Sequence, residues 1–304
     1  MFPRKKLNGY EGEMRPFKMI GNLYYVGTYQ ACSHLIDTGD GLILIDTGYA
    51  NTLYLVVHSI HTLGFNPKDI KYIINTHWHW DHTAGTAELA GLSGAKTLIG
   101  KDDFEAAKKY FTADITVKDG DVLSLGNTSI RFVETPGHTK GTISMFFDVT
   151  DGGKTYRVGT FGGAGANTLR KNTFEYENAR SDYFNSLNRL RSEKVDVFMA
   201  NHTWNNDTEE KSKVLLETGE NQFIDEALFP KFLDFCEARL KSIIEEENNM
   251  YINSKKRCQK PAAFDIFSFS ALLAAAVLHY EGLTVSALIL RRILLVSSDM
   301  DFVE

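Results

Sequence analysis

Apolar residues recur with the period of a strand at the start of the chain and with the period of a helix soon after. Two pairs of β-prone runs, each with glycine at the turn, predict hairpins over residues 17–26 and 32–46. Leucine, valine and isoleucine at three- and four-residue spacing then predict a helix over residues 49–63, followed by a strand at residues 72–74. The chain therefore begins with strands and then alternates between helices and strands.

The second half of the chain adds a meander of strands, then one more helix and strand. The expected helices cover residues 83–92, 101–111 and 174–191, and the last is predicted to bury Tyr176, Phe184, Leu187 and Leu190. The expected strands cover residues 95–99, 122–125, 130–134, 142–148, 155–161 and 195–200. This order predicts an α/β fold, a four-layer αβ/βα sandwich of two mixed β-sheets with outer helices.

After residue 208 the pattern becomes helical, with helices predicted over residues 209–218 and 231–249. Residues 262–296 are unusually apolar, but charged residues interrupt them, and a membrane-spanning helix needs about 20 apolar residues in a row. Packing on protein is therefore the better interpretation, and membrane attachment is disfavoured.

The chain is expected to form two domains. A catalytic domain would cover residues 1–215, and a helical C-terminal extension would cover residues 216–304. The apolar extension would pack on the catalytic domain or join two copies in a homo-oligomer.

Composition narrows the class of partner. The chain has 304 residues and a net charge of -6, which disfavours a nucleic-acid binder and leaves a small-molecule substrate. Three cysteines, Cys32, Cys236 and Cys258, are too few for a disulfide framework, although Cys236 and Cys258 could pair in an exported protein. No signal peptide is visible, so the sequence as it stands predicts a cytoplasmic location, or a secreted or periplasmic one if a leader has been removed.

The stretch Asn-Thr-His-Trp-His-Trp-Asp-His-Thr concentrates metal-binding side chains directly after an apolar run. His77, His79, Asp81 and His82 fall within six positions, and imidazole nitrogens and carboxylate oxygens are good ligands for zinc. Alternate side chains of an extended segment point the same way, so His77 and His79 can hold one ion together. Asp81 and His82 follow where the chain should turn into a helix, which suits a second, adjacent ion.

Two more histidines follow predicted strands. His138 lies in the loop Thr-Pro-Gly-His-Thr, where Gly137 allows a sharp bend, and His202 comes directly after the strand at residues 195–200. Together with the first cluster they make six ligands from three loops. That is enough for two ions with positions left open for water and substrate.

These motifs resemble the metallo-β-lactamase superfamily. The resemblance covers residues 16–215 and includes Thr-Pro-Gly-His-Thr-x-Gly and Leu-Ile-Leu-Ile-Asp-Thr-Gly. It implies one zinc ion held by three histidines and a second held by an aspartate and two histidines, with Asp46 orienting the site. The implied ligand sets are His77, His79 and His138, and Asp81, His82 and His202. Iron or manganese would accept the same ligands.

Departures from the family's patterns narrow the resemblance. Glyoxalase II-like thioesterases and acyl-homoserine lactonases carry a metal-bridging Asp near the end of the strand after His138, and the first subclass of zinc β-lactamases carries a Cys in that region. Residues 156–163 contain neither. The chain is therefore most similar to the third subclass of class B β-lactamases.

The resemblance implies a hydrolase that uses a di-zinc-bound hydroxide to open a cyclic amide, with Asp81 orienting the nucleophile. A lactone, ester or thioester hydrolase is one alternative, and a metal-binding module without turnover is another. Aromatic side chains near the ligands and a polar loop at residues 163–171 are the candidates for substrate binding. They are Trp78, Trp80, Phe161, Asn167 and Arg170.

Overall fold

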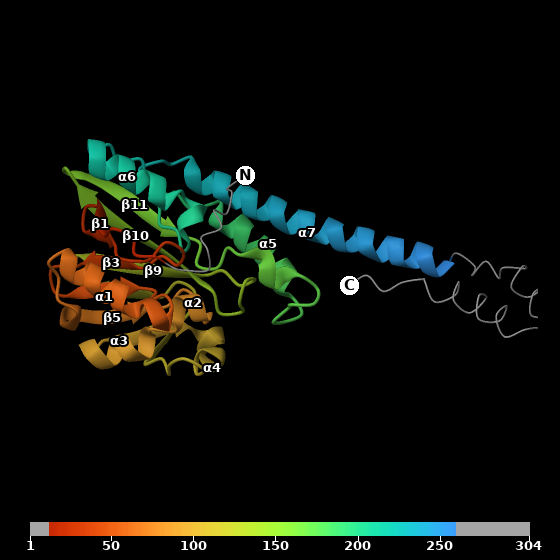
Figure 1. Ribbon diagram of the computed structural model, residues 1–304, viewed down its shortest axis with the longest axis horizontal. Helices are drawn as coiled ribbons and strands as arrows, with labels where there is room; N and C mark the ends of the chain where they lie inside the picture. Colours follow the sequence, from red (N-terminus) through yellow and green to blue (C-terminus); the bar gives the residue numbers. More distant parts are fainter. Residues whose placement is uncertain (1–11, 260–304) are drawn as a thin grey trace, which may run out of the picture. The chain divides into compact units, whose positions relative to one another are not determined.

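The computed structural model describes residues 12–259 of the chain, in which two β-sheets pack face to face with helices on their outer sides (Figure 1). The strands are β1 (Phe17–Ile20), β2 (Leu23–Tyr25), β3 (His34–Asp37), β4 (Leu42–Ile45), β5 (Ile70–Ile74), β6 (Lys96–Gly100), β7 (Ile115–Val117), β8 (Val122–Leu125), β9 (Thr128–Glu134), β10 (Ile143–Asp151), β11 (Lys154–Thr160) and β12 (Val197–Phe198). The α-helices are α1 (Leu53–Thr62), α2 (Trp80–Thr83), α3 (Thr86–Ser93), α4 (Phe104–Ala107), α5 (Ala179–Leu190), α6 (Thr208–Thr218) and α7 (Leu228–Gln259). Short 3₁₀ turns are η1 (Ala50–Thr52), η2 (Pro67–Asp69), η3 (Lys101–Asp103), η4 (Ala166–Leu169) and η5 (Thr203–Asn205).

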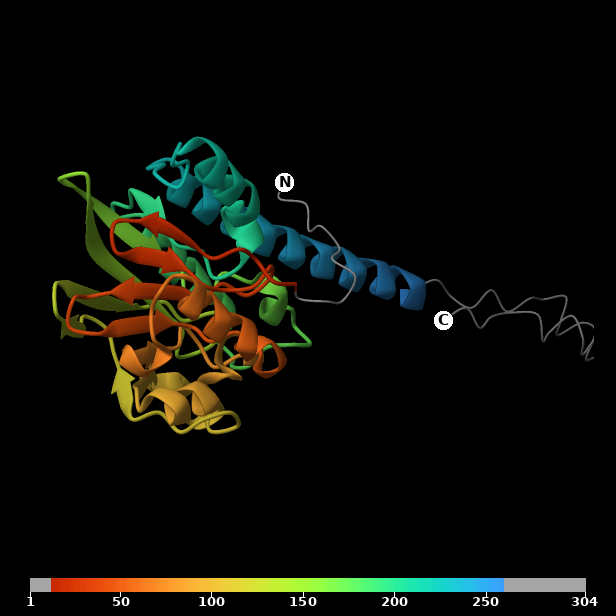
Figure 2. The ribbon, with the colours of Figure 1, turned by 60° about the vertical axis from the view of Figure 1, so that its left-hand side comes forward.

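Both sheets are mixed. The first has the order β1-β2-β3-β4-β5-β6-β7, in which β1 to β4 pair antiparallel and β4 to β7 pair parallel. Figure 2 shows β1 to β4, in red and orange, running side by side. The second has the order β12-β11-β10-β9-β8, antiparallel except for the parallel pair β11 and β12.

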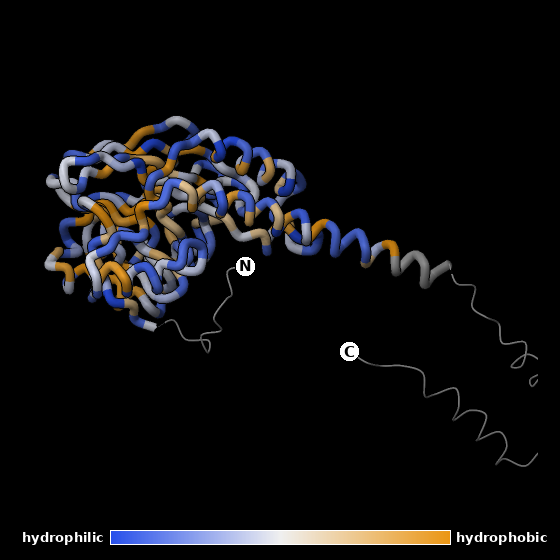
Figure 3. The backbone as a smooth tube through the Cα atoms, turned by 90° about the horizontal axis from the view of Figure 1, so that it is seen from above, coloured by the Kyte–Doolittle hydropathy of each residue, from blue (hydrophilic) through white to orange (hydrophobic). Residues whose placement is uncertain are grey.

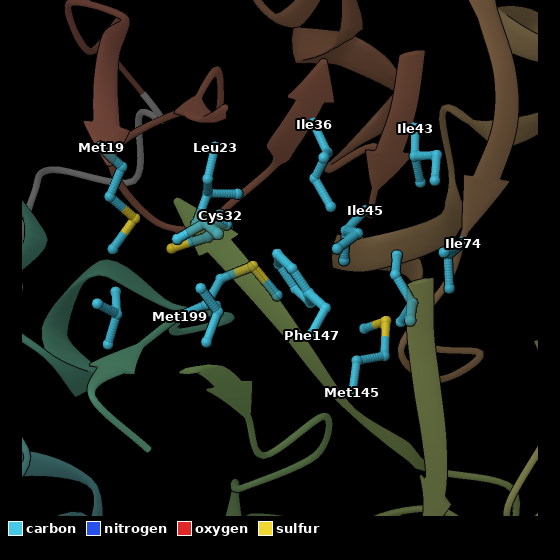
Figure 4. Packing of buried hydrophobic residues seen from close by; sticks show 14 of the residues in the cluster. Met19, Leu23, Cys32, Ile36, Ile43, Ile45, Ile74, Met145, Phe147 and Met199 are labelled. Carbon is cyan, nitrogen blue, oxygen red and sulfur yellow. The ribbon is translucent and has the colours of Figure 1, made fainter. Parts of the chain in front are cut away.

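The central core lies between the sheets, and strand parity explains it. Successive side chains of a strand point to opposite faces. In β4, Ile43 and Ile45 therefore join the core between the sheets, while Leu42 and Leu44 join a separate cluster under the helices. In β10, Met145 faces the central core and Phe146 faces the opposite side. Figure 4 shows Ile43, Ile45 and Met145 in this central layer.

Helices cover the two outer faces. The apolar stripe of α1, with Leu53, Val56 and Ile60, packs on the first sheet together with Leu89 of α3. The second sheet is covered by α5 through side chains that include Leu187. The predicted four-layer αβ/βα sandwich is therefore confirmed.

The helix α7 supplies a second cover for the second sheet. Its apolar residues recur at three- and four-residue spacing, as an amphipathic helix requires, and Figure 3 shows hydrophobic stretches alternating with hydrophilic ones along it. The buried members are Phe229, Phe232, Leu233, Cys236, Leu240 and Ile243. The chain divides into two units between Ile244 and Glu245, whereas the sequence placed a boundary at residue 215.

Several predictions about the C-terminal region reach beyond the described residues. The apolar residues 262–296, and with them the expected homo-oligomer contact, lie outside that range. No helix within residues 12–259 is both long and apolar enough to cross a membrane. Of the two cysteines that could pair, Cys236 is buried and free among the described residues, and nothing described tests the pairing with Cys258.

Two local helix predictions were wrong in detail, and one strand was not predicted. The expected helix at residues 83–92 begins later, as α3 at Thr86, and the short helix α2 before it ends at Thr83; Gly85 lies between them, where a Cβ would lie 2.9 Å from Leu53 Cδ1. The expected helix at residues 101–111 forms only η3 and the single turn α4. The strand β7 was missed because it has only three residues.

The helix expected at residues 174–191 begins later, at Ala179. The residues before it form a loop, in which Arg180 covers the ring of Phe174 and Glu175 contacts two residues of the ligand stretch. Tyr176 therefore lies outside the helix, and Phe184 is only partly buried. The buried face of α5 is instead Ala179, Tyr183, Ser186, Leu187 and Leu190.

Candidate metal centre

The six predicted ligands come together where strands of both sheets end. His77, His79, Asp81 and His82 lie in the segment that follows β5, His138 lies between β9 and β10, and His202 follows β12. They form two groups, and within each group the ligand atoms lie within 4.8 Å of one another. Group 1 is His77, His79 and His138, and group 2 is Asp81, His82 and His202.

In group 1, one nitrogen of each imidazole is directed outward to an acceptor. His77 Nδ1 donates to Gly162 O at 2.9 Å, and His138 Nδ1 donates to Gly165 O at 2.6 Å. His79 uses its other nitrogen, Nε2, toward the carboxylate of Glu175 at 2.8 Å. Because carbonyl and carboxylate oxygens accept hydrogen bonds, the outward nitrogens carry the protons and the inward nitrogens carry lone pairs.

The inward nitrogens of group 1 converge in a way that suits a bound cation. His79 Nδ1 and His138 Nε2 lie 2.9 Å apart, lone pair against lone pair. His77 Nε2 is buried without a hydrogen-bond partner, a costly arrangement for a polar atom. Burial, with neighbouring imidazoles adding to it, lowers the pKa of His138 to about 3 and the pKa of His77 well below its usual range. Both rings are therefore neutral, which is the ligating form.

Group 2 combines a carboxylate with two imidazoles. Asp81 Oδ2 lies 3.4 Å from His82 Nε2 and 3.6 Å from His202 Nε2. The outward nitrogens are again held, His82 Nδ1 by Asp46 at 2.9 Å and His202 Nδ1 by Gln30 O at 3.2 Å. Burial raises the pKa of Asp81, but the charges of His82 and His202 outweigh it and lower that pKa, so Asp81 is a carboxylate.

The two groups adjoin each other through His77 and His82, whose ring centroids lie 4.3 Å apart. Three imidazole nitrogens in one group, and two nitrogens with a carboxylate oxygen in the other, form donor sets that suit zinc. Each outward nitrogen has the kind of acceptor that orients metal-bound histidines in proteins. The arrangement can therefore hold two divalent cations side by side.

Asp46 connects the end of β4 to the ligand stretch. Its backbone takes the left-handed conformation with φ of 57°, and its two carboxylate oxygens are all but buried. Oδ1 accepts from Thr76 N and Oδ2 accepts from Thr76 Oγ1, both at 2.8 Å, while Oδ2 also holds His82. These contacts are the ones an orienting residue would make.

The glycine-rich segment after β11 has a role that sequence reasoning missed. Its backbone carbonyls, Gly162 O and Gly165 O, hold His77 and His138. A Cβ at Gly165 would lie 3.0 Å from His138 Cε1, and a Cβ at Gly162 would lie 1.8 Å from Ile143 O. Glycine is therefore required for the backbone to come this close to the ligands.

Asp103 is a second residue that sequence reasoning missed. It is buried at the end of η3, where Oδ2 accepts from Trp78 N at 3.0 Å and Thr139 Oγ1 at 2.7 Å, and Oδ1 accepts from Gly141 N at 2.6 Å. It thus ties the segment of His77 and His79 to the loop of His138. Burial raises its pKa to about 6, although these hydrogen bonds oppose the rise. Only its position just after the strand at residues 95–99 could have drawn attention to it.

The five predicted substrate contacts differ in exposure: one is buried, two are exposed and two are half-buried. Phe161 is fully buried, with its ring centroid 5.5 Å from that of Tyr183 in the core under α5, so its prediction as a substrate contact was wrong. Trp80 is 56% exposed and meets Tyr49 edge to face. Asn167 in η4 is exposed.

The remaining two candidates are half-buried. Arg170 follows η4, and Trp78 donates its indole N–H to Glu175 Oε2 at 3.1 Å. Trp204, another aromatic residue near the ligands, stacks on His202 with the ring centroids 4.4 Å apart and the planes 11° from parallel. Trp204 therefore lies beside group 2 and Trp78 beside His79 of group 1, while the exposed Trp80 directly precedes Asp81 in the chain.

The sequence matches a family model and several known proteins. The family model described as the metallo-beta-lactamase superfamily matches residues 26–202. Hydroxyacylglutathione hydrolase of Rhodospirillum rubrum is 31% identical over 137 residues, which cover 45% of this chain and 48% of that protein. The chain matches less than half the length of the first such curated relatives.

Two similar solved structures match almost in full. The subclass B3 metallo-β-lactamase BJP-1 of Bradyrhizobium japonicum has a TM-score of 0.75 and 27% identity over 80% of this chain and 98% of that chain. The class B3 di-zinc metallo-β-lactamase LRA-12, from an Alaskan soil metagenome, has a TM-score of 0.70 and 27% identity over 75% and 94%.

Proposed function

The chain belongs to the metallo-β-lactamase superfamily, and from this premise we propose that it is a two-metal hydrolase that opens a cyclic amide. The observation that carries the proposal is the pairing of group 1 and group 2, each with its ligand atoms inward and its outer nitrogens held. The expected resemblance to the third subclass of class B is confirmed by the similar solved structures, which are subclass B3 enzymes.

We propose zinc as the metal at both groups. The donor sets fit zinc, and a similar structure is described as a di-zinc enzyme. Zinc bound there would supply Lewis acidity and would bring the pKa of a coordinated water near neutrality. Iron or manganese would find the same ligand types acceptable.

The protein's own groups have distinct tasks in this proposal. The neutral imidazoles of His77 and His138 offer lone pairs without competition from protons at neutral pH. Asp81 remains ionised, so its carboxylate would help to hold the cation of group 2 and could also accept a hydrogen bond from the attacking water and orient it. Asp46 fixes the ring of His82, and Trp80 offers an apolar surface to the substrate beside group 2.

The end of β11 supports an amide substrate over a thioester. The segment that follows β11 carries no acid, and a Cβ at Gly162 would lie 1.8 Å from Ile143 O and one at Gly163 would lie 2.8 Å from Thr142 Oγ1. Neither position can present a carboxylate to the metals without moving backbone or a neighbouring side chain. The metal-bridging Asp of glyoxalase II-like thioesterases therefore has no counterpart there.

A thioester hydrolase is the second candidate. The specific observation in its favour is the 31% identity to hydroxyacylglutathione hydrolase of Rhodospirillum rubrum. Lactone and ester hydrolysis would use the same groups, since each reaction needs a polarised carbonyl and an activated water.

One set of assays separates these candidates. The zinc-loaded full chain is given a chromogenic cephalosporin, a lactone and a thioester, with and without a chelator. Turnover of the cephalosporin that the chelator abolishes and added zinc restores is the expected result. Turnover of the thioester alone would replace the proposal with the second candidate. A protein that binds two metal ions but hydrolyses none of the three would be a metal-binding module without turnover.

A further inference from the structure

Glu175 touches the ligand stretch from the loop that precedes α5. Its Oε1 accepts from His79 Nε2 at 2.8 Å, and its Oε2 accepts from the Trp78 indole nitrogen at 3.1 Å. The Glu175 side chain is 26% exposed and the His79 side chain is 16% exposed. One carboxylate therefore binds two consecutive residues of the stretch that supplies four of the six candidate ligands.

This contact differs from those that hold the other four histidines. The outward nitrogens of three of them donate to backbone carbonyls, and His82 donates to the buried Asp46. Among the histidines of the two groups, His79 alone has its outward nitrogen held by a solvent-accessible side chain. It is also the one histidine that directs Nδ1 inward, with Nδ1 2.9 Å from His138 Nε2.

The inward nitrogen of His79 thus depends on Glu175. Either imidazole nitrogen can carry the proton of the neutral ring, and the hydrogen bond made by one nitrogen decides which one binds metal. With Glu175 accepting from Nε2, the lone pair is placed on Nδ1, which faces group 1. The negative charge of Glu175 behind the ring also makes Nδ1 a stronger electron-pair donor to a metal ion.

Trp78 donates a hydrogen bond to Glu175 and is itself held by Asp103. Its backbone N–H is held by Asp103, and its indole N–H is held by Glu175. The ring of Trp78 lies against His79, with the centroids 4.8 Å apart. Glu175 is therefore anchored by two donors, one of them a residue that is itself fixed from the opposite side.

We propose that Glu175 is a positioning residue of the metal centre, which holds His79 in the tautomer that binds metal at group 1 through Nδ1. The proposal rests on the two-metal function proposed above but not on the identity of the substrate. It distinguishes the two groups, because Glu175 acts on group 1 and, within residues 12–259, makes no hydrogen bond or ion pair with a member of group 2.

The test compares Glu175→Ala and Glu175→Gln with a matched control, Glu177→Gln. Glu177 is exposed in the same loop and makes no hydrogen bond or ion pair within residues 12–259. The metal-free full chains are titrated with zinc against a chromophoric chelator, and then with cobalt(II), whose visible absorption reports the geometry of each site. Thermal unfolding of the metal-free chains checks that all variants fold alike.

The expected result is selective weakening of one ion. Loss of a residue behind a metal ligand typically lowers metal affinity about 10-fold to 100-fold, so Glu175→Ala should raise one Kd by about that factor and leave the other within about 3-fold. Glu175→Gln, which still accepts from His79 but lacks the charge, should fall between Glu175→Ala and the wild type, and Glu177→Gln should match the wild type. The cobalt absorption of the weakened site should shift in both Glu175 variants.

Two results would overturn the inference. One is a Glu175→Ala protein that binds both ions with wild-type Kd and an unchanged cobalt spectrum. The other is equal weakening of both sites. Failure of the proposed function would look different, since a wild-type chain that binds two ions and hydrolyses no lactam leaves this test unaffected.

Discussion

The two ligand groups can each hold a cation, but they use different types of ligand. Group 1 presents three imidazoles, of which two are held from behind by the carbonyls of Gly162 and Gly165 and the third by the carboxylate of Glu175. Group 2 includes the carboxylate of Asp81, and Asp46 adds a second negative charge behind His82. Each group has one carboxylate behind an imidazole, but only group 2 has a carboxylate among its ligands, so direct Coulomb attraction to a cation is larger at group 2.

The supports of the two groups also differ in proportion. Group 1 has two backbone carbonyls, for which glycine is required, and one side chain, Glu175. Group 2 has one backbone carbonyl, Gln30 O behind His202, and one side chain, Asp46 behind His82, which a mutation can remove without a clash. The ligand residues of the two groups are of similar types. The residues that hold their outward nitrogens differ, and they decide how the metal affinity of each group responds to mutation.

Removal of an inward atom should have the largest effect. His77→Ala deletes a ligand that adjoins both groups, so we expect kcat/KM for the hydrolysed substrate to fall about 1000-fold or more, since metal catalysis supplies several kcal/mol. Steady-state kinetics with saturating zinc measure this. A variant that keeps activity within 10-fold of wild type would remove His77 from the site.

Removal of the side-chain support should have the next largest effect, confined to group 2. Asn at position 46 cannot accept from Thr76 N, Thr76 Oγ1 and His82 together, so Asp46→Asn should lower kcat/KM and the affinity for one zinc about 10-fold to 100-fold. Zinc titration and kinetics measure both quantities. Asp40→Asn, at an exposed turn position, serves as the control, and equal effects at the two positions would argue against the orienting role.

His34, a buried histidine outside both groups, tests separately how burial keeps an imidazole neutral in this fold. Burial lowers the pKa of His34 to about 3, from the ordinary value of 6.5. A histidine with a depressed folded pKa contributes stability above pH 6.5, and that stability is lost as the pH falls toward 3. By pH 5 the loss should reach about 2 kcal/mol.

The measurement is denaturant unfolding of the metal-free protein at pH 7 and pH 5. His34→Phe keeps a flat ring next to Tyr25 and cannot be protonated, so the variant should lose about 2 kcal/mol less than the wild type over this interval. Identical pH dependence in the two proteins would show that His34 does not stay neutral in the fold.

The smallest effects should separate the core from the rim. Phe161→Leu trims a core side chain, so it should cost about 1 kcal/mol of stability and leave KM unchanged. Trp80→Ala removes an exposed ring beside group 2, so it should raise KM about 3-fold and leave stability unchanged. Urea unfolding together with steady-state kinetics tests both, and the reverse assignment of effects would contradict the placement of these two rings.

The sequence predicted the layers and the ligands for physical reasons. Strand parity is local, so Ile43 and Leu44 could be assigned to opposite faces from their neighbours alone. His77, His79, Asp81 and His82 are close in sequence, and that proximity alone was informative. Phe161 was misjudged because nearness to a ligand loop in sequence does not reveal which way a ring points.

The outward supports could not be predicted, because they depend on long-range contacts. Gly162 O reaches His77 across 85 positions, and Glu175 reaches His79 across 96. Glu175 lies in a segment with a helical pattern, but it contacts Trp78 and His79, and α5 begins four residues after it. Asp103 is of the same kind, since its three donors come from two separate loops.

Metal count per chain tests the central claim most directly. Native mass spectrometry of the full chain after zinc loading should find two zinc ions on the wild type, and fewer than two on both His77→Ala and Asp81→Ala. A wild type that takes up fewer than two ions, or two variants that each retain both ions, would contradict the two-metal centre.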